Sequence, residues 1–150
     1  MGKQLTAAIV GLLAIGLLVA GCGGSSDSIS RAEFIKGANV ACKKGEEQIQ
    51  KTYIAFLKKH ANVTNPTEAD YAELVATVFV PNVEKEIAQL RALEAPSGDE
   101  DKVKAFIDAR QESIQIAEDN PKMLLTEGSK VTAKSAQLAK EYGLESCGNS

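Results

Sequence analysis

Apolar or small residues recur every three or four positions through the first half of the chain, and this repeat most narrows the possible folds. Its members are Phe34, Ala38, Cys42, Gly45, Ile49, Tyr53 and Phe56. Such spacing puts them all on one face of an α-helix, whereas a half-buried strand would alternate at every second residue. We therefore predict a long amphipathic helix that must bury this face against other elements.

A capping box marks the beginning of this helix. Ser30 stands where the N-cap belongs and Glu33 follows three residues later, while Ile29 and Phe34 occupy the positions of a hydrophobic staple. The apolar repeat fades near His60, so the first helix is expected to end there.

A second helix is predicted to begin with Asn65 as N-cap and Pro66 in the first turn. Its apolar face is Tyr71, Leu74, Val75, Val78, Val83, Ile87 and Leu90. Pro81 interrupts this stretch, because proline lacks a backbone donor and clashes with the preceding turn. We predict one helix kinked at Pro81. The alternative, a short strand over "ATVFV", would have no partner strand.

Two more helices follow. Ser97 and Glu100 offer a capping box for the third, which Asn120 and Pro121 would end. The apolar residues of the third helix are Val103, Phe106, Ile107, Ile114 and Ala117. Those of the fourth, taken as one helix, are Leu124, Val131, Ser135, Leu138 and Tyr142. Gly143 and Leu144 are typical of the Schellman motif that closes a helix.

Composition agrees with helices rather than a sheet. Aromatic residues make up only 5% of the chain and Trp is absent, so the core must consist mostly of Ala, Leu, Ile and Val. Four helices joined by short loops predict an all-α fold, an up-down antiparallel four-helix bundle over residues 30–150. The formal net charge of −3 argues against nucleic acid as a partner, because phosphate binding needs clustered Lys and Arg.

The first 21 residues have the pattern of an export signal. Lys3 precedes sixteen uncharged residues, from Leu5 to Ala20, which is short for a membrane span of about 20. Small residues follow where a membrane anchor would carry basic ones. The segment Val19-Ala20-Gly21-Cys22 resembles a bacterial lipobox, which implies a diacylglyceryl group on Cys22 and cleavage after Gly21. An uncleaved membrane helix, or an ordinary signal peptide beside an incidental cysteine, is the alternative.

This interpretation divides the chain into a lipoprotein signal peptide (1–21), a Gly/Ser tether (22–29) and the helical bundle domain (30–150). Two or more acyl chains give stable membrane anchoring where one chain would be marginal. The protein is therefore expected on the extracytoplasmic face of the cell membrane, with the membrane itself as a partner through Cys22.

With Cys22 assigned to lipid, Cys42 and Cys147 remain as an even pair in an exported protein, and a disulfide between them is expected. Cys42 lies about 18 Å along the first helix from Ser30. In a four-helix up-down bundle the last helix ends near that starting pole, and the five residues from Tyr142 to Cys147 reach about 16 Å. The tail can therefore just meet Cys42. Two buried free thiols are the alternative.

The sequence contains few residues in patterns typical of catalysis or metal binding, and we predict no catalytic site, metal site or cofactor site. His60 is the only histidine and stands in the polar stretch "LKKHAN", where we expect a solvated side chain. Zinc sites usually need several His or Cys ligands. Glu84, Lys85 and Glu86 are expected to form a solvated face. Asn39, one turn before Cys42, is expected to hydrogen-bond the backbone of the docked tail.

Three stretches, "FIKGANVAC", "VPNVEKEIAQLRALEAPSGDEDKV" and "AKEYGLESCG", resemble a group of small actinobacterial lipoproteins. The resemblance spans most of the mature chain and implies an actinobacterial envelope. It brings no activity with it.

These observations favour a non-enzymatic lipoprotein that binds an envelope partner or a small apolar ligand. A structural or stress-related surface lipoprotein without a ligand is the competing hypothesis. A cavity lined by Tyr53, Tyr71 and Tyr142 would favour ligand binding, and a filled core would favour the structural role.

Replacing Cys22 tests the anchor directly. The Cys22→Ala variant should lose all incorporation of a clickable fatty-acid analogue in the producing cell, because no thiol remains at the lipidation position. The measurement is in-gel fluorescence of the purified protein. Labelling that persists in Cys22→Ala would exclude the lipoprotein assignment.

Overall fold

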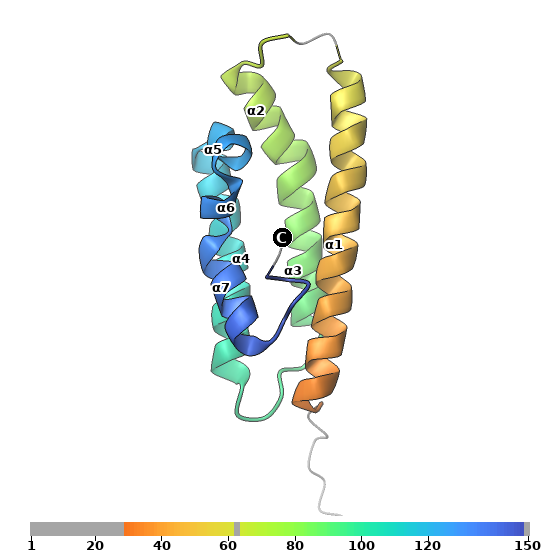
Figure 1. Ribbon diagram of the computed structural model, residues 1–150, viewed down its shortest axis with the longest axis vertical. Helices are drawn as coiled ribbons and strands as arrows, with labels where there is room; N and C mark the ends of the chain where they lie inside the picture. The colour runs from red at the N-terminus through yellow and green to blue at the C-terminus, as the bar shows by residue number, and fades with distance from the viewer. Residues whose placement is uncertain (1–28, 62–63, 149–150) are drawn as a thin grey trace, which may run out of the picture.

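The computed structural model describes residues 29–61 and 64–148, and the regular structure within these ranges is entirely helical (Figure 1). The prediction of an all-α fold is confirmed. The predicted signal peptide, Cys22 and all of the predicted tether except Ile29 lie outside the described residues.

Helix α1 (Arg31–Lys59) begins and ends where the sequence predicted. The Ser30 hydroxyl accepts a hydrogen bond from the Glu33 backbone N–H, and the Glu33 carboxylate accepts one from the Ser30 N–H, which is a complete capping box. His60 is the C-cap. The first half of its apolar face is buried, through Phe34, Ala38 and Cys42, whereas Ile49, Tyr53 and Phe56 in the second half are only partly covered.

The next helical stretch is made of α2 (Glu68–Leu74), a π-helical turn η1 (Val75–Phe79) and α3 (Val80–Arg91), which follow one another without a break. The predicted N-cap at Asn65 is wrong. Thr67 is the N-cap, because its hydroxyl and the Asp70 carboxylate form a reciprocal capping box, which Asn65 and Pro66 do not provide.

The prediction of one helix running through Pro81 is confirmed, and the π turn explains how the proline is accommodated. At the end of η1 the Val80 N–H donates to the Val75 carbonyl, five residues back. Such a turn widens the helix just before Pro81, whose ring would otherwise press on the carbonyl one turn earlier. Figure 1 shows α2 leaning away from the line of α3 at this point.

Helix α4 (Glu100–Asp119) buries all five of its predicted core residues. The predicted capping box of Ser97 and Glu100 is wrong. Asp99 is the N-cap, and the Glu100 carboxylate instead accepts a hydrogen bond from the N–H of Gly98, at 2.8 Å. Gly98 has φ +85°, so the loop turns too early for Ser97 to lie over the first helical turn.

The predicted last helix is divided into α5 (Pro121–Thr126), α6 (Gly128–Val131) and α7 (Ala133–Tyr142), so its prediction as one helix is wrong. Glu127 leaves the helical conformation, with φ −142° and ψ 34°, and Gly128 follows it. The C-terminal Schellman motif is confirmed. Gly143 has φ +93°, its N–H donates to the Lys140 carbonyl, and the Leu144 N–H donates to the Ala139 carbonyl.

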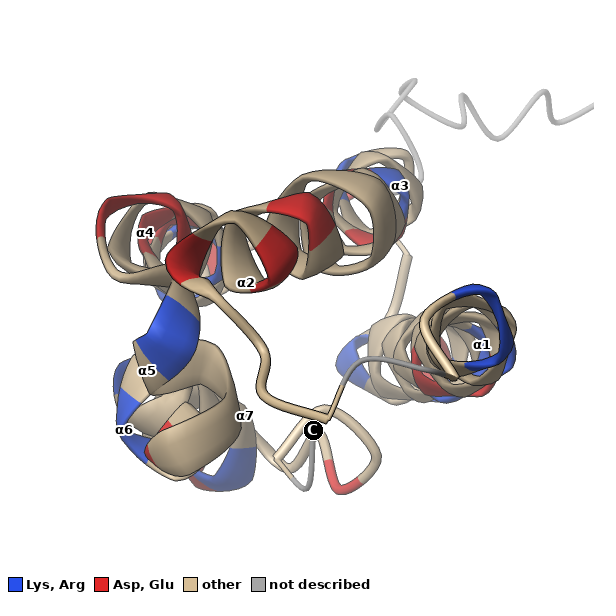
Figure 2. Ribbon diagram, turned by 90° about the horizontal axis from the view of Figure 1, so that it is seen from above, with Lys and Arg blue, Asp and Glu red and all other residues tan. Residues whose placement is uncertain are grey.

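The chain reverses direction after α1, after α3 and after α4 (Figure 1). Helix α1 packs on α3 and η1, α3 packs on α4, and α4 packs on α5 and α7, while α2 meets α5. Seen from above, α1 and the α5–α7 segment stand at separate corners, and the C-terminal tail lies between them (Figure 2).

A buried ion pair lies where α3 packs on α4. Glu86 and Arg110 are each 1% exposed, and both the Nε and the Nη2 of Arg110 donate to Glu86 Oε1, at 3.0 and 2.6 Å. Burial raises the pKa of Glu86, and the guanidinium of Arg110 opposes that rise. The prediction of a solvated Glu86 is therefore wrong, although Glu84 and Lys85 are exposed as expected.

Replacing one member of this pair should destabilise the fold more than replacing both. Arg110→Met leaves the Glu86 carboxylate buried without its partner, so the free energy of unfolding should fall by about 3 to 5 kcal/mol. Adding Glu86→Met removes the remaining charge and should recover most of that loss. Urea unfolding followed by circular dichroism measures both. A double variant less stable than the single one would contradict this account.

Candidate functional site

A disulfide joins the C-terminal tail to the middle of α1. Cys42 and Cys147 are bonded, with their Cα atoms 5.1 Å apart and a sequence separation of 105. The predicted pairing is confirmed, and the tail reaches Cys42 by lying back along α1 after Gly143, as the chain length requires. Both sulfur atoms are fully buried.

Asn39 holds the same tail one turn before Cys42. Its Oδ1 accepts a hydrogen bond from the Ser146 backbone N–H at 2.8 Å, which is the structural role predicted for it. The chain end that follows α7 is thus held at two positions on α1.

A polar cluster joins the start of α1 to the end of α7 and to the loop before α4. Arg31 lies over the Tyr142 ring, 4.6 Å from its centroid, and donates to the Tyr142 carbonyl. The Tyr142 hydroxyl donates to Asp99 Oδ2 at 2.9 Å, while Lys102 donates to Asp99 Oδ1 at 2.7 Å. Phe34 meets the Tyr142 ring edge-on.

The pKa values in this cluster follow from its contacts. The hydrogen bond from Lys102, and after it the one from Tyr142, hold the pKa of Asp99 below its usual value. Burial, followed by the hydrogen bond to the Asp99 carboxylate, raises the pKa of Tyr142 to about 12.

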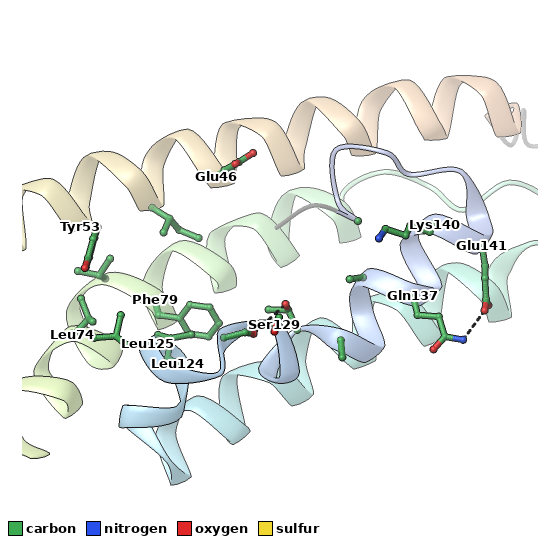
Figure 3. A pocket seen from close by; sticks show the side chains of 17 residues that line it. Glu46, Tyr53, Leu74, Phe79, Leu124, Leu125, Ser129, Gln137, Lys140 and Glu141 are labelled. Carbon is green, nitrogen blue, oxygen red and sulfur yellow. Dashed lines mark hydrogen bonds between the residues drawn. The ribbon is translucent and has the colours of Figure 1, made fainter.

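A cleft of about 960 Å³ lies between α1 and the α5–α7 segment (Figure 3). Its lining residues are Glu46, Ile49, Tyr53, Leu74, Val78, Phe79, Leu124, Leu125, Gly128, Ser129, Thr132, Ala133, Ala136, Gln137, Lys140, Glu141 and Gly148. Most of this surface is carbon. The volume is near the upper end of the range of small-molecule sites, about 300 to 1,000 Å³.

The cleft exists because the apolar stripe of α1 extends further than its packing partners. Ile49 and Tyr53 continue the buried face of α1, yet they form one wall of the cleft and are only partly covered. Leu74, Val78 and Phe79 come from the end of α2 and from η1 and lie in the same cleft. The π turn thus contributes directly to the site, a common location for such turns.

Polar side chains gather toward the end of the cleft nearest the tail. Figure 3 shows Lys140, Gln137 and Glu141 on α7 at this end, whereas Glu46 lies on α1 across the cleft, between Tyr53 and Lys140 along its length. The Glu141 carboxylate accepts a hydrogen bond from Gln137 at 2.8 Å. Leu74, Phe79, Leu124 and Leu125 lie toward the opposite end (Figure 3). The cleft is therefore amphipathic along its length.

A smaller cavity of about 350 Å³ lies between α1 and α3 and is lined mostly by polar residues, among them Lys44, Lys51, Asn82 and Glu86. Glu86 Oε2, unlike Oε1, has no hydrogen-bond partner and lies beside Gly45. A Cβ at position 45 would come within 2.3 Å of that oxygen, so only glycine leaves room for the carboxylate.

The three tyrosines considered from the sequence have different surroundings. Tyr53 lines the large cleft, whereas Tyr71 is not among its lining residues and Tyr142 is held in the polar cluster with Asp99. Leu124 and Leu125 were not singled out as site residues. The sequence did contain a signal for them. Two adjacent leucines cannot both be buried on one helix face, so one was bound to be exposed, and Leu125 is 48% exposed.

The prediction of a solvated His60 is wrong. Its side chain is 17% exposed and stacks on Phe56, with ring centroids 4.2 Å apart. Asp70 and Glu73 of α2 lie 3.7 and 3.5 Å from its two ring nitrogens. The stretch "LKKHAN" is polar in sequence and therefore suggested an exposed side chain. The cover over His60 comes from α2, which the chain folds back over this end of α1.

Among residues 29–61 and 64–148, no group of three or more His, Cys, Asp or Glu side chains could hold a metal ion. Nor does any helix in this part of the chain have the length and apolar character to cross a membrane. Comparisons with known protein families, curated proteins and solved structures found no match to this chain.

Alkaline pH should weaken the polar cluster through Tyr142. Because folding raises the pKa of its phenol from 10.0 to about 12, the stability it contributes is present below pH 10 and is lost as the pH rises toward 12. The difference in urea midpoint between wild type and Tyr142→Phe should therefore shrink from pH 9 to pH 12. A difference that stays constant over this range would show that the hydroxyl does not titrate in this way.

Proposed function

We propose that this chain is a lipid-anchored lipoprotein on the extracytoplasmic face of the cell membrane. Its domain, an up-down four-helix bundle in which the divided α5–α7 segment takes the place of the fourth helix, would bind a small apolar ligand without catalysing a reaction. The anchor rests on the sequence alone, on the uncharged segment that ends in the lipobox-like Val19-Ala20-Gly21-Cys22.

The cleft between α1 and α5–α7 carries the ligand-binding part of the proposal. A small domain that had only a structural role would gain stability by closing α1 onto α7 and burying Ile49, Tyr53 and Leu125. Instead these side chains border about 960 Å³ of open volume. Sites of this size with mostly apolar walls and a few polar groups are the usual form of small-molecule pockets.

The lining argues for binding rather than catalysis. Its polar side chains are hydroxyls, an amide, one lysine and two glutamates, and the lining includes no histidine, cysteine or aspartate. Ser129 and Thr132 therefore have no histidine within the lining that could activate them as nucleophiles.

The short connection to Cys22 suits a ligand that comes from the membrane. Ser30 follows Cys22 by eight positions, and a fully extended chain of that length spans about 26 Å. The helical domain would remain within that distance of the bilayer surface, where apolar molecules are concentrated.

Filling the cleft should abolish binding of an apolar probe. Ser129 lies in the cleft wall on a short helix, and Ser129→Trp adds bulk there, whereas Lys130→Trp alters the next residue, which does not line the cleft. Titration of the purified protein with the fluorescent dye N-phenyl-1-naphthylamine should show binding by wild type and Lys130→Trp. Ser129→Trp should bind at least tenfold more weakly. Equal dye binding by both variants would contradict a ligand site in this cleft.

A further inference from the structure

The charges in the cleft define the chemistry of a ligand more closely than its apolar walls do. Three charged side chains line it, Glu46, Lys140 and Glu141. Glu141 is engaged by Gln137, to which it is joined by the dashed line in Figure 3. Within the described residues, Lys140 and Glu46 make neither an ion pair nor a side-chain hydrogen bond.

The tail determines where the Lys140 side chain lies. Its Cγ would be 2.8 Å from a Cβ at position 148, so the lysine stem runs directly over Gly148, a contact that any larger residue there would disturb. Gly148 is buried and follows Cys147, which the disulfide bonds to α1. The stem of Lys140 is thus held by the same tail that borders the cleft, and its ammonium remains available to a ligand.

Glu46 stands on the opposite side. It is an exposed residue of α1, four positions after Cys42, and lines the cleft together with Ile49 on the next turn. It is more than 4.0 Å from the Lys140 ammonium, because the two form no salt bridge. Two carboxylates and one ammonium therefore line the cleft from two different helices, and of these Lys140 and Glu46 are the two whose charged groups have no partner among the described residues.

We propose that the cleft binds a single-chain lipid with a zwitterionic head group, of the phosphoethanolamine type. The acyl chain would lie along Leu74, Phe79 and Leu124, the phosphate would pair with Lys140, and the ammonium would pair with Glu46. This inference rests on the proposed function and adds the head group to it.

Charge complementarity separates this ligand from other amphiphiles. A purely anionic head would gain Lys140 but would face the carboxylate of Glu46, and a neutral head would satisfy neither residue. Only a head that carries both signs pairs both side chains at once. Ion pairs near a protein surface contribute modestly, so a preference of about two- to fivefold per charge is expected.

Photo-crosslinking of the full lipidated chain in nanodiscs tests the proposal. Three monoacyl probes would share one diazirine-bearing acyl chain and differ only in the head, which is phosphoethanolamine, phosphoglycerol or glycerol. The yield of adducts on cleft peptides, read by mass spectrometry, should be about two- to fivefold higher for the phosphoethanolamine probe than for the phosphoglycerol probe, and about four- to twenty-fivefold higher than for the glycerol probe. Glu46→Gln should reduce its yield to about that of the phosphoglycerol probe, and Lys140→Met should reduce it by about two- to fivefold.

Matched controls come from neighbouring charges that do not line the cleft. Lys134→Met on α7 and Glu47→Gln on α1 remove the same charges and should leave the yield unchanged. Equal adduct yields for the three heads would overturn the head-group proposal while leaving an apolar site in place. Absence of adducts on cleft peptides with all three probes would overturn both this inference and the proposed function.

Discussion

The Cys42–Cys147 disulfide is the interaction on which the rest of the arrangement depends. Helix α1 packs on α3 and η1 and meets α7 at Tyr142, and the bridged tail adds a covalent link between the first helix and the last. Closing a loop of 105 residues contributes about 4 to 5 kcal/mol in the chain-entropy description. The bridge also holds the tail against the middle of α1. Because the tail lies between these helices at one end, the remaining length of α1 stays separated from α5–α7 and the cleft remains open.

A second constraint acts between α3 and α4. Glu86 and Arg110 occupy positions in the apolar faces of their helices, and any packing that separated them would leave a buried charge unpaired, at a cost of several kcal/mol. The pair therefore disfavours other alignments of α3 on α4 more than it stabilises the observed one. With α3 and α4 aligned, η1 presents Val78 and Phe79 to the cleft. The π turn therefore lines the cleft, and it also accommodates Pro81, which has no backbone N–H.

Much of the helical structure could be predicted because its signals are local. The capping box of Ser30 and Glu33, the Schellman motif at Gly143 and the helix through Pro81 depend on residues within a turn or two of one another. The wrong N-caps at Asn65 and Ser97 show the limit of such signals. In both places the sequence offers two acceptable caps within two residues, and the path of the connecting loop decides between them.

The sequence by itself determined the all-helical structure of residues 29–61 and 64–148, the disulfide partners and the contact of Asn39 with the tail, because helical periodicity, cysteine number and chain length leave few alternatives. Tertiary structure alone decided that Glu86 is buried, that His60 is covered by α2 and that the stripe of α1 is left partly uncovered beside Leu125. The physical reason is the same in each case. Whether a side chain is exposed depends on which helix, distant in sequence, packs over it. The residues next to it in the sequence do not specify that contact.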